Sequence, residues 1–372
     1  MPIVATNIQL DSTEGMDKIT STEKVTSPYF SDGSTELLGS SVVSSSLSGD
    51  NEKYFFGISK TGAATTEEFN VAFGSTNGYG HSVETNTKSE SEAIYKQFAS
   101  MLLTPTEVTG GFFISRNSSL TTAPSEASIT TGKDSEIFIL SSRRTNHKDR
   151  LNKGNWTVAL SGSSTTIAEA SGKLVELTDD SVNDSPISTP AGDRYNIVSG
   201  TLGTVVKAAS VKTYGFYYPD MGIMVFSQQE LTSSIPRNDD TVSEIVQFGS
   251  ASYAGFATPA TTNLDSDQAV RFINCLSGSD AKLSFRDEED QISAQYFCRV
   301  RSGHCNFSNN PTFVSGSLNE LRHSKMRGNP QTFISSVQLY NNAGDMVAVG
   351  NLSSPLKKNF QSEATIKVKL TY

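Results

Sequence analysis

The last nine residues of the chain, 364–372, alternate apolar and polar side chains with a period of two, with Ala364, Ile366, Val368, Leu370 and Tyr372 at the apolar positions. Successive side chains of a strand point to opposite faces of a sheet, so the pattern predicts a half-buried final strand. Upstream, residues 332–340 and 346–352 flank a Gly-containing turn, which predicts a β-hairpin. We expect Pro355 to interrupt the ladder after the hairpin and the last strand to complete an antiparallel meander.

Most of the remaining chain consists of short apolar runs separated by turn residues. One segment has a helical period: Ile94, Phe98 and Met101 follow a capping box at 89–92, which predicts a helix over about 89–103. A second short helix is predicted within 265–276, and an acidic, solvated turn within 285–291. Strands are expected at 54–58, 69–73, 112–115, 135–141, 156–160, 174–177, 195–198, 205–209, 214–218, 223–227 and 294–301.

Because these strands do not alternate with long helices, doubly wound α/β folds and TIM barrels are excluded. The predicted class is mainly β, all-β or β-rich α+β, with antiparallel sandwich-like sheets, one or two short helices and a C-terminal antiparallel meander. The composition agrees, since 36% hydrophobic and 19% charged residues leave a large share of Ser, Thr, Asn and Gly.

Shifts in composition along the chain predict four parts. Residues 1–50 form a Ser/Thr-rich N-terminal arm, 51–235 a β-rich domain containing the helix at 89–103, 236–265 a linker or long loop, and 266–372 a C-terminal β-domain. The arm is too polar to be ordered by core burial. We therefore expect contacts to order it, made either with its own sheet or with neighbouring subunits.

Net charge and targeting signals limit the binding partners and the cellular compartment that we expect for this chain. The net charge of -9 argues against sequence-independent binding to nucleic acid or anionic lipid. We find no apolar run of about 20 residues that would span a membrane and no signal peptide, so synthesis in the cytoplasm is expected. The three cysteines, Cys275, Cys298 and Cys305, are too few and too sparse for a disulfide framework.

The densest basic stretch, residues 143–153, follows the strongly apolar run 137–140. It is interpreted either as a partner-docking loop or as a solvated loop between two strands. Asp149 and the lack of interleaved aromatic residues disfavour nucleic acid as the partner. The candidate partner-docking residues are Arg143, Arg144, Lys148, Arg150 and Lys153.

Candidate chemistry elsewhere is weak. Six residues separate Cys298 from Cys305, which follows His304, and there is no second cluster, so the paired spacing of a zinc site is absent. The acidic residues 287–290 and the pairs 179–180 and 239–240 lack the alternation of a calcium loop and are interpreted as solvated turns. No nucleophile elbow or phosphate loop occurs. We therefore predict no enzyme, no catalytic, cofactor-binding or metal-binding residues, and no cofactor.

Several segments resemble a known family. They are Gln-Tyr-Phe-Cys-Arg-Val at 295–300, Phe-Ser-Asn-Asn-Pro-Thr-Phe-Val at 307–314, the run 329–342, Val-Ala-Val at 347–349 and the end of the chain at 363–370, with Ala-Ile-Tyr-Lys-Gln-Phe at 93–98, Asn-Trp-Thr-Val-Ala-Leu at 155–160 and Tyr-Tyr-Pro-Asp-Met-Gly-Ile at 217–223 upstream. In this order they are similar to virion structural proteins of marine T-even-like contractile-tailed bacteriophages. The resemblance spans about residues 50–372, and the last 80 residues are its most specific part.

The resemblance implies a non-enzymatic tail subunit, in the baseplate or its periphery, that acts through protein–protein interfaces. Its expected partners are other tail and baseplate proteins and several symmetry-related copies of itself, with no nucleic acid and no membrane span, and its expected location is the virion after synthesis in the host cytoplasm. The Ser/Thr/Asn-rich strands and Tyr217–Tyr218 motivate an alternative, a host-receptor or carbohydrate-binding β-domain of a tail appendage. A capsid or neck decoration protein is a third interpretation.

Overall fold

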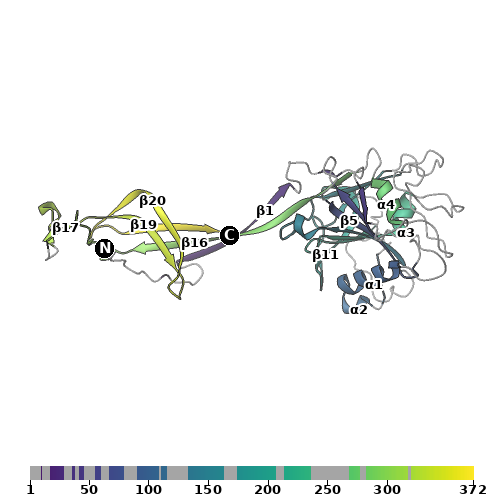
Figure 1. Cartoon of the computed structure of the whole chain (residues 1–372), viewed down its shortest axis with the longest axis horizontal. Helices are drawn as coiled ribbons and strands as arrows, with labels where there is room; N and C mark the ends of the chain where they lie inside the picture. The colour runs from purple at the N-terminus through teal and green to yellow at the C-terminus, as the bar shows by residue number, and fades with distance from the viewer. Residues whose placement is uncertain are drawn as a thin grey trace. The chain divides into compact units, whose positions relative to one another are not determined.

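The structure is a computed structural model. It describes residues 10, 17–28, 36–37, 42–45, 55–59, 67–78, 90–108, 110–114, 133–162, 174–206, 213–235, 268–276, 282–316 and 320–372. The chain divides into a small unit, Met1–Lys24 with Asp290–Tyr372, and a large unit, Val25–Glu289. Both units are built mainly of antiparallel strands, which confirms the predicted β-rich class (Figure 1).

The large unit contains one long antiparallel sheet. Its strand order is β2 (Glu36–Leu37), β15 (Lys282–Ser284), β8 (Thr157–Ser161), β9 (Leu174–Asp179), β11 (Gly192–Thr201), β13 (Thr213–Tyr218), β14 (Ile223–Ser227), β6 (Glu136–Ser142), β5 (Glu67–Ser75), β4 (Phe55–Ser59) and β3 (Val42–Ser45), while β10 (Ile187–Thr189) and β12 (Thr204–Val205) pair with β11.

The outer strands of this path, β2 and β3, follow each other in the sequence. The five residue steps from Leu37 to Val42 can span at most about 18 Å. The sheet must therefore curl until its two edges approach each other, in the manner of a half-barrel. This curling gives the sheet an inner face, and most of the apolar core lies there.

The central strands are buried on both faces. In β6, Ile137 and Ile139 belong to one apolar cluster, whereas Phe138 and Leu140 belong to the other. The same alternation occurs in β14 and in residues 216–218 of β13, and it explains why these segments are nearly continuous apolar runs. Helix α1 (Glu90–Leu102) covers one face, and α3 (Gln228–Ser234) and α4 (Gln268–Leu276) pack against the other (Figure 1).

Of the four helices in the described part of the chain, two were predicted from the sequence. Helix α1 confirms the predicted helix, and its Tyr95 hydroxyl donates to the Asp134 carbonyl at 2.7 Å. Helix α4 confirms the second predicted helix. Helix α3 was not predicted, because its residues are mostly polar; the Ser227 side chain caps it by accepting the Glu230 N–H. The remaining helix, α2 (Pro105–Val108), is a single turn.

The small unit consists of separate sheets of two or three strands. Strands β1 (Lys18–Pro28), β16 (Arg286–Val300) and β21 (Ala364–Thr371) lie side by side with β16 in the centre, and β7 (Arg150–Leu151) pairs with the first residues of β16 inside the large unit. Strands β19 (Thr332–Tyr340) and β20 (Met346–Lys358) form a hairpin, and β17 (Val314–Ser315) pairs with β18 (Glu320–Leu321).

The hairpin is confirmed, but the predicted meander needs a correction. Strand β21 pairs with β16 over eight residues, from Ser293 opposite Thr371 to Val300 opposite Ala364, and not with the hairpin. The alternating pattern of β21 fixed which face is buried, but it carried no information about the neighbouring strand. Pro355 does not end the ladder either, because it lies in a bulge where residues 352–355 of β20 are unpaired.

Other expectations meet the structure as follows. Residues 110–114 contain no strand, although Phe112 and Ile114 are buried. The predicted C-terminal domain began at 266, whereas α4 and β15 pack in the core of the large unit and the small unit resumes at Asp290.

In the N-terminal arm, the described segments are strands: β1 lies beside β16, β2 beside β15 and β3 beside β4. The predicted linker 236–265 and the acidic pair 239–240 lie outside the described residues.

The inner core centres on stacked aromatic rings, and Phe285 lies among them, with ring centroids 4.8 Å from Phe69 and 5.5 Å from Trp156. Phe285→Ala should lower the free energy of unfolding by about 3–5 kcal/mol, since it leaves a cavity in a closed core. Urea unfolding followed by the fluorescence of Trp156, the single tryptophan, measures this. The exposed control Val182→Ala should stay within about 0.5 kcal/mol. Equal stabilities of the two variants would contradict the described core.

Candidate functional site

The basic stretch 143–153 connects β6 to β8 and contains β7. After a single 3₁₀ turn, Arg144–Asn146, the chain becomes extended, and β7 pairs antiparallel with the start of β16. Arg150 lies opposite Glu288, and Leu151 lies opposite Asp287. The densest basic stretch and the densest acidic stretch of the sequence are therefore adjacent in space.

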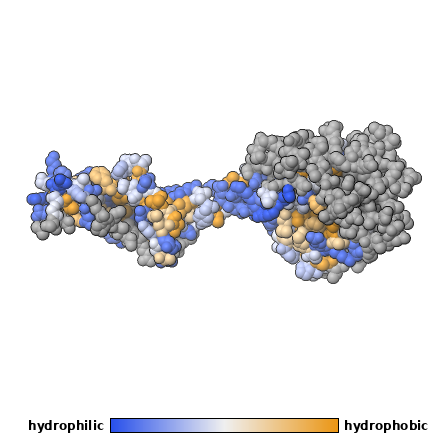
Figure 2. Space-filling model, viewed as in Figure 1, coloured by the Kyte–Doolittle hydropathy of each residue, from blue (hydrophilic) through white to orange (hydrophobic). Residues whose placement is uncertain are grey.

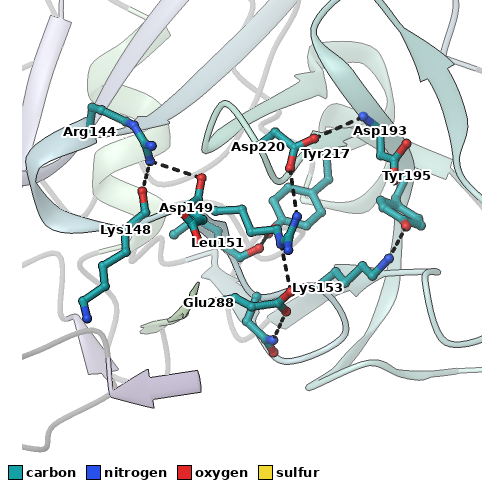
Figure 3. A network of polar contacts seen from close by, with 12 residues as sticks. Arg144, Lys148, Asp149, Leu151, Lys153, Asp193, Tyr195, Tyr217, Asp220 and Glu288 are labelled. Carbon is teal, nitrogen blue, oxygen red and sulfur yellow. Dashed lines mark hydrogen bonds and ion pairs between the residues drawn. The ribbon is translucent and has the colours of Figure 1, made fainter. Parts of the chain in front are cut away.

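Arg144 stabilises the loop itself. Its Nη1 donates to the backbone carbonyl of Lys148 and, at 3.2 Å, to that of Asp149 (Figure 3). A guanidinium group has several donors in a fixed plane, so it can hold successive carbonyls of a tight loop. His147 lies within the same loop and is buried, with Nδ1 3.2 Å from the Arg143 carbonyl. Burial lowers the pKa of His147, which favours the neutral imidazole.

Glu288 is the centre of the polar network. Its side chain is only 4% exposed, and its two carboxylate oxygens have separate donors: Arg150 Nε at 2.8 Å and Asn152 Nδ2 at 2.6 Å (Figure 3). Arg150 Nη1 also lies 3.8 Å from Asp220 Oδ1. A buried carboxylate is costly unless it is paired and hydrogen-bonded. The two donors therefore stabilise the burial of Glu288 and hold the first residues of β16 against β7.

Further contacts extend the network on both sides. Lys148 pairs with Glu289 at the exposed side. Lys153 Nζ donates to the Tyr195 hydroxyl at 2.6 Å (Figure 3). The hydrogen bond to Tyr195 raises the pKa of Lys153. Tyr217 is fully buried and donates its hydroxyl to the Leu151 carbonyl at 3.1 Å. The basic stretch is thus tied to β11, β13 and β16 of the same chain.

The structure changes the interpretation of both charged stretches. Arg144, Lys148, Arg150 and Lys153 all contact groups of their own chain, and Arg143 is exposed with its backbone N–H 3.2 Å from the Glu68 carbonyl. Docking of a partner at these residues stays a prediction. The prediction of an acidic, solvated turn at 285–291 was wrong, because Arg286–Val300 is one strand in which Asp287 and Glu288 are buried.

Sequence analysis did not single out Glu288, Asn152 or Asp220 as members of a site. The available signal was the charge complementarity of 143–153 and 287–290, two stretches separated by more than a hundred residues. Opposite charge in a sequence does not fix distance in space, since many surface charges never pair. Only the pairing of β7 with β16 brings them together.

The pair Asp179–Asp180 was predicted to be a solvated turn, and this was also wrong, because both residues are buried. Asp179 accepts the Gly154 N–H at 2.8 Å, and Asp180 accepts the Asn196 side-chain amide at 2.7 Å. Burial raises the pKa of both carboxyl groups, that of Asp180 to about 6. These groups anchor the turn after β9 to its neighbours.

Other candidate chemistry can be placed as well. Cys298 lies in β16, where burial raises the pKa of its thiol, and all three cysteines are free. Cys305 precedes Asn306, in a loop of the small unit that Lys358 holds. Among the described residues, no cluster of three His, Cys, Asp or Glu side chains could hold a metal ion. Within the same residues, none of the helices is long and apolar enough to cross a membrane.

Lys358 organises the loop beside the hairpin. Its side chain is fully buried, and the ammonium group donates to the carbonyls of Ser302 and Asn359 at 3.0 and 2.8 Å and to Asn306 Oδ1 at 2.9 Å. Three oxygens match the three donors of a lysine. Next to this loop lies a cavity of about 470 Å³ whose lining includes Phe307 and Phe360, both half exposed.

Comparisons of the chain with protein-family models, with curated proteins and with solved structures find no match.

The pairing of Arg150 with Glu288 can be measured with a double-mutant cycle of Arg150→Met and Glu288→Gln. We expect a coupling energy of about 1–3 kcal/mol in urea unfolding, because the Glu288 carboxylate is desolvated and each single variant leaves a partner behind. The exposed pair Lys148 and Glu289 is the matched control and should couple more weakly, since solvent screens it. A coupling for the buried pair no larger than for the exposed pair would contradict the described network.

The raised pKa of Asp180 predicts how stability depends on pH. Between pH 4 and 6 the folded state keeps the proton, whereas the unfolded chain loses it near its ordinary pKa of 3.8. Stability should therefore fall as the pH rises through this window, by about 2 kcal/mol for this group, and change no further above it. Asp180→Asn should remove that part of the fall, and the exposed control Asp149→Asn should retain it. Urea unfolding at pH 4, 5, 6 and 7 tests this, and identical profiles for Asp180→Asn and the wild type would refute it.

Proposed function

We propose that this protein is a non-enzymatic structural subunit of a bacteriophage virion, in the tail or baseplate, that acts through protein–protein interfaces. The observation that carries the proposal is the lack of a shared apolar core in the described part of the small unit. Both clusters of buried apolar side chains lie in the large unit. The segment resemblance to tail proteins of contractile phages supplies the particular assembly.

The described part of the small unit exposes more large apolar side chains than it buries. Among its described residues, the buried apolar ones are Ala294, Val300, Phe313, Val314 and Ile366. Side chains that are at least one-third exposed are Ile19, Phe307, Phe333, Tyr340, Met346, Val347, Val349, Leu356, Phe360 and Tyr372. Figure 2 shows apolar side chains gathered on this unit. Folding of a domain depends on burying apolar surface, so these side chains support contacts with other protein surfaces.

Charge supports the same conclusion. Residues 290–372 carry nine Lys and Arg against four Asp and Glu, although the whole chain has a net charge of -9. Residues 1–289 are therefore strongly acidic, and their net charge is opposite in sign to that of residues 290–372. Such asymmetry orients association between subunits and raises its rate.

The receptor-binding alternative is favoured by one observation, the cavity beside the half-exposed rings of Phe307 and Phe360. Sugars stack on aromatic rings but also need converging polar groups. Asn306, which lines the cavity, is buried and already accepts a hydrogen bond from Lys358. The cavity therefore suits an apolar side chain of a protein partner better than a sugar. Glycan arrays and adsorption assays with the isolated protein discriminate the two functions.

The virion proposal is tested in purified particles of the phage that encodes the chain. Quantitative mass spectrometry should find the chain in fixed stoichiometry to the tail proteins. A gene variant Val349→Asp should lower its incorporation severalfold, because it places a charge on the exposed apolar hairpin, whereas Val182→Asp on the large unit should not. Absence of the wild-type chain from purified particles would overturn the proposal.

A further inference from the structure

The β19–β20 hairpin is unusual in what it leaves uncovered. Within the described residues, β19 and β20 pair only with each other, so each has an open edge. A two-stranded hairpin alone is marginally stable in water. Tyr340, Met346 and Val349 are each more than half exposed, on the face where Tyr340 lies opposite Met346 and Gln338 opposite Val349.

Proteins normally protect such edges with charges, prolines or bulges. Strand β21 follows this rule, since Lys367 and Lys369 are exposed along it. Strand β20 follows it in another way, through its bulge at residues 352–355, which contains Pro355. Strand β19 has neither charge nor proline among its nine residues, Thr332–Tyr340, and its one irregularity is Ser335, which the register skips where it shifts between Ile334 and Ser336.

We propose that β19 pairs edge to edge, in antiparallel orientation, with β19 of a second copy of this chain, so that two hairpins form a four-stranded sheet. Full overlap of the nine residues places Ser336 on the two-fold axis and Phe333 opposite Leu339 of the other copy. The pairing rests on the proposed function, because it names one partner of the assembling small unit.

A second copy fits this edge better than an unrelated strand. Symmetric pairing closes both open β19 edges at once, and an isologous contact repeats each favourable pair twice. Strand β19 contains no charged side chain, so the paired edges neither repel each other nor select a partner of opposite charge, and the exposed Lys357 lies on β20, away from the new pair.

Two exposed aromatic side chains lie on β19 itself. Phe333 is 60% and Tyr340 54% exposed, whereas the exposed apolar side chains of β20 lie one strand further from the second copy. Across the two-fold axis Phe333 lies opposite Leu339 and Tyr340 opposite Thr332 of the other copy.

Two variants of the full-length chain test the pairing. Ser336→Lys brings two charges together at the axis and should weaken dimerisation at least tenfold in sedimentation equilibrium, while Ser353→Lys, at a position that is also exposed but lies on β20, should leave it unchanged. Ser336→Cys should form an intermolecular disulfide under mild oxidation, because residues directly opposite each other across two strands are close enough for one, and Ser353→Cys should not.

A wild-type chain that is monomeric at its highest soluble concentration would overturn the pairing, as would a dimer that Ser336→Lys and Ser353→Lys affect equally. These outcomes are separable from the virion test. A monomer that is nevertheless incorporated into particles refutes β19 pairing and leaves the proposed function standing. If the chain forms a β19-dependent dimer but is absent from particles, the β19 pairing stands and the proposed function is refuted.

Discussion

The buried carboxylate of Glu288 is the group on which the pairing of β7 with β16 depends. An ionised group in an apolar environment is tolerated only when its oxygens have donors, and Arg150 and Asn152 supply them from one short stretch. The same stretch forms β7, so the ion pair and the strand pairing reinforce each other. Strand β16 begins at this point, and its later residues, 293–300, pair with β21.

The two units follow different physical rules. The large unit resembles an ordinary domain, in which central strands are buried on both faces and aromatic rings such as Trp156 and Phe285 pack in contact. The described small unit is held by backbone ladders and by polar contacts such as those of Lys358, with little apolar burial. Backbone hydrogen bonds contribute modest net stability, since the unfolded chain forms them with water. This difference is why we place the assembling surfaces on the small unit.

The strands of the small unit differ in whether their open edges carry features that prevent further pairing. The lysines of β21 and the bulge of β20 make further pairing unfavourable. The edge of β19 carries no charge, which supports the proposed pairing, and because β19 lies on an exposed hairpin, that pairing needs no rearrangement of the rest of the fold.

The sequence by itself determined the local structure: the β-rich class, the helices α1 and α4, the β19–β20 hairpin and the alternating faces of β21 all follow from periodicity and turn residues. Tertiary structure alone decided the neighbours. That β21 joins β16, that β2 and β3 form opposite edges of one curled sheet, and that the acidic residues 287–288 are buried against β7 depend on contacts between distant segments. A period of two fixes which side chains share a face, but it is satisfied equally by every strand that could lie alongside. The same limit applies to the candidate site, where Arg150 could be named from its charge and Glu288 only from its burial.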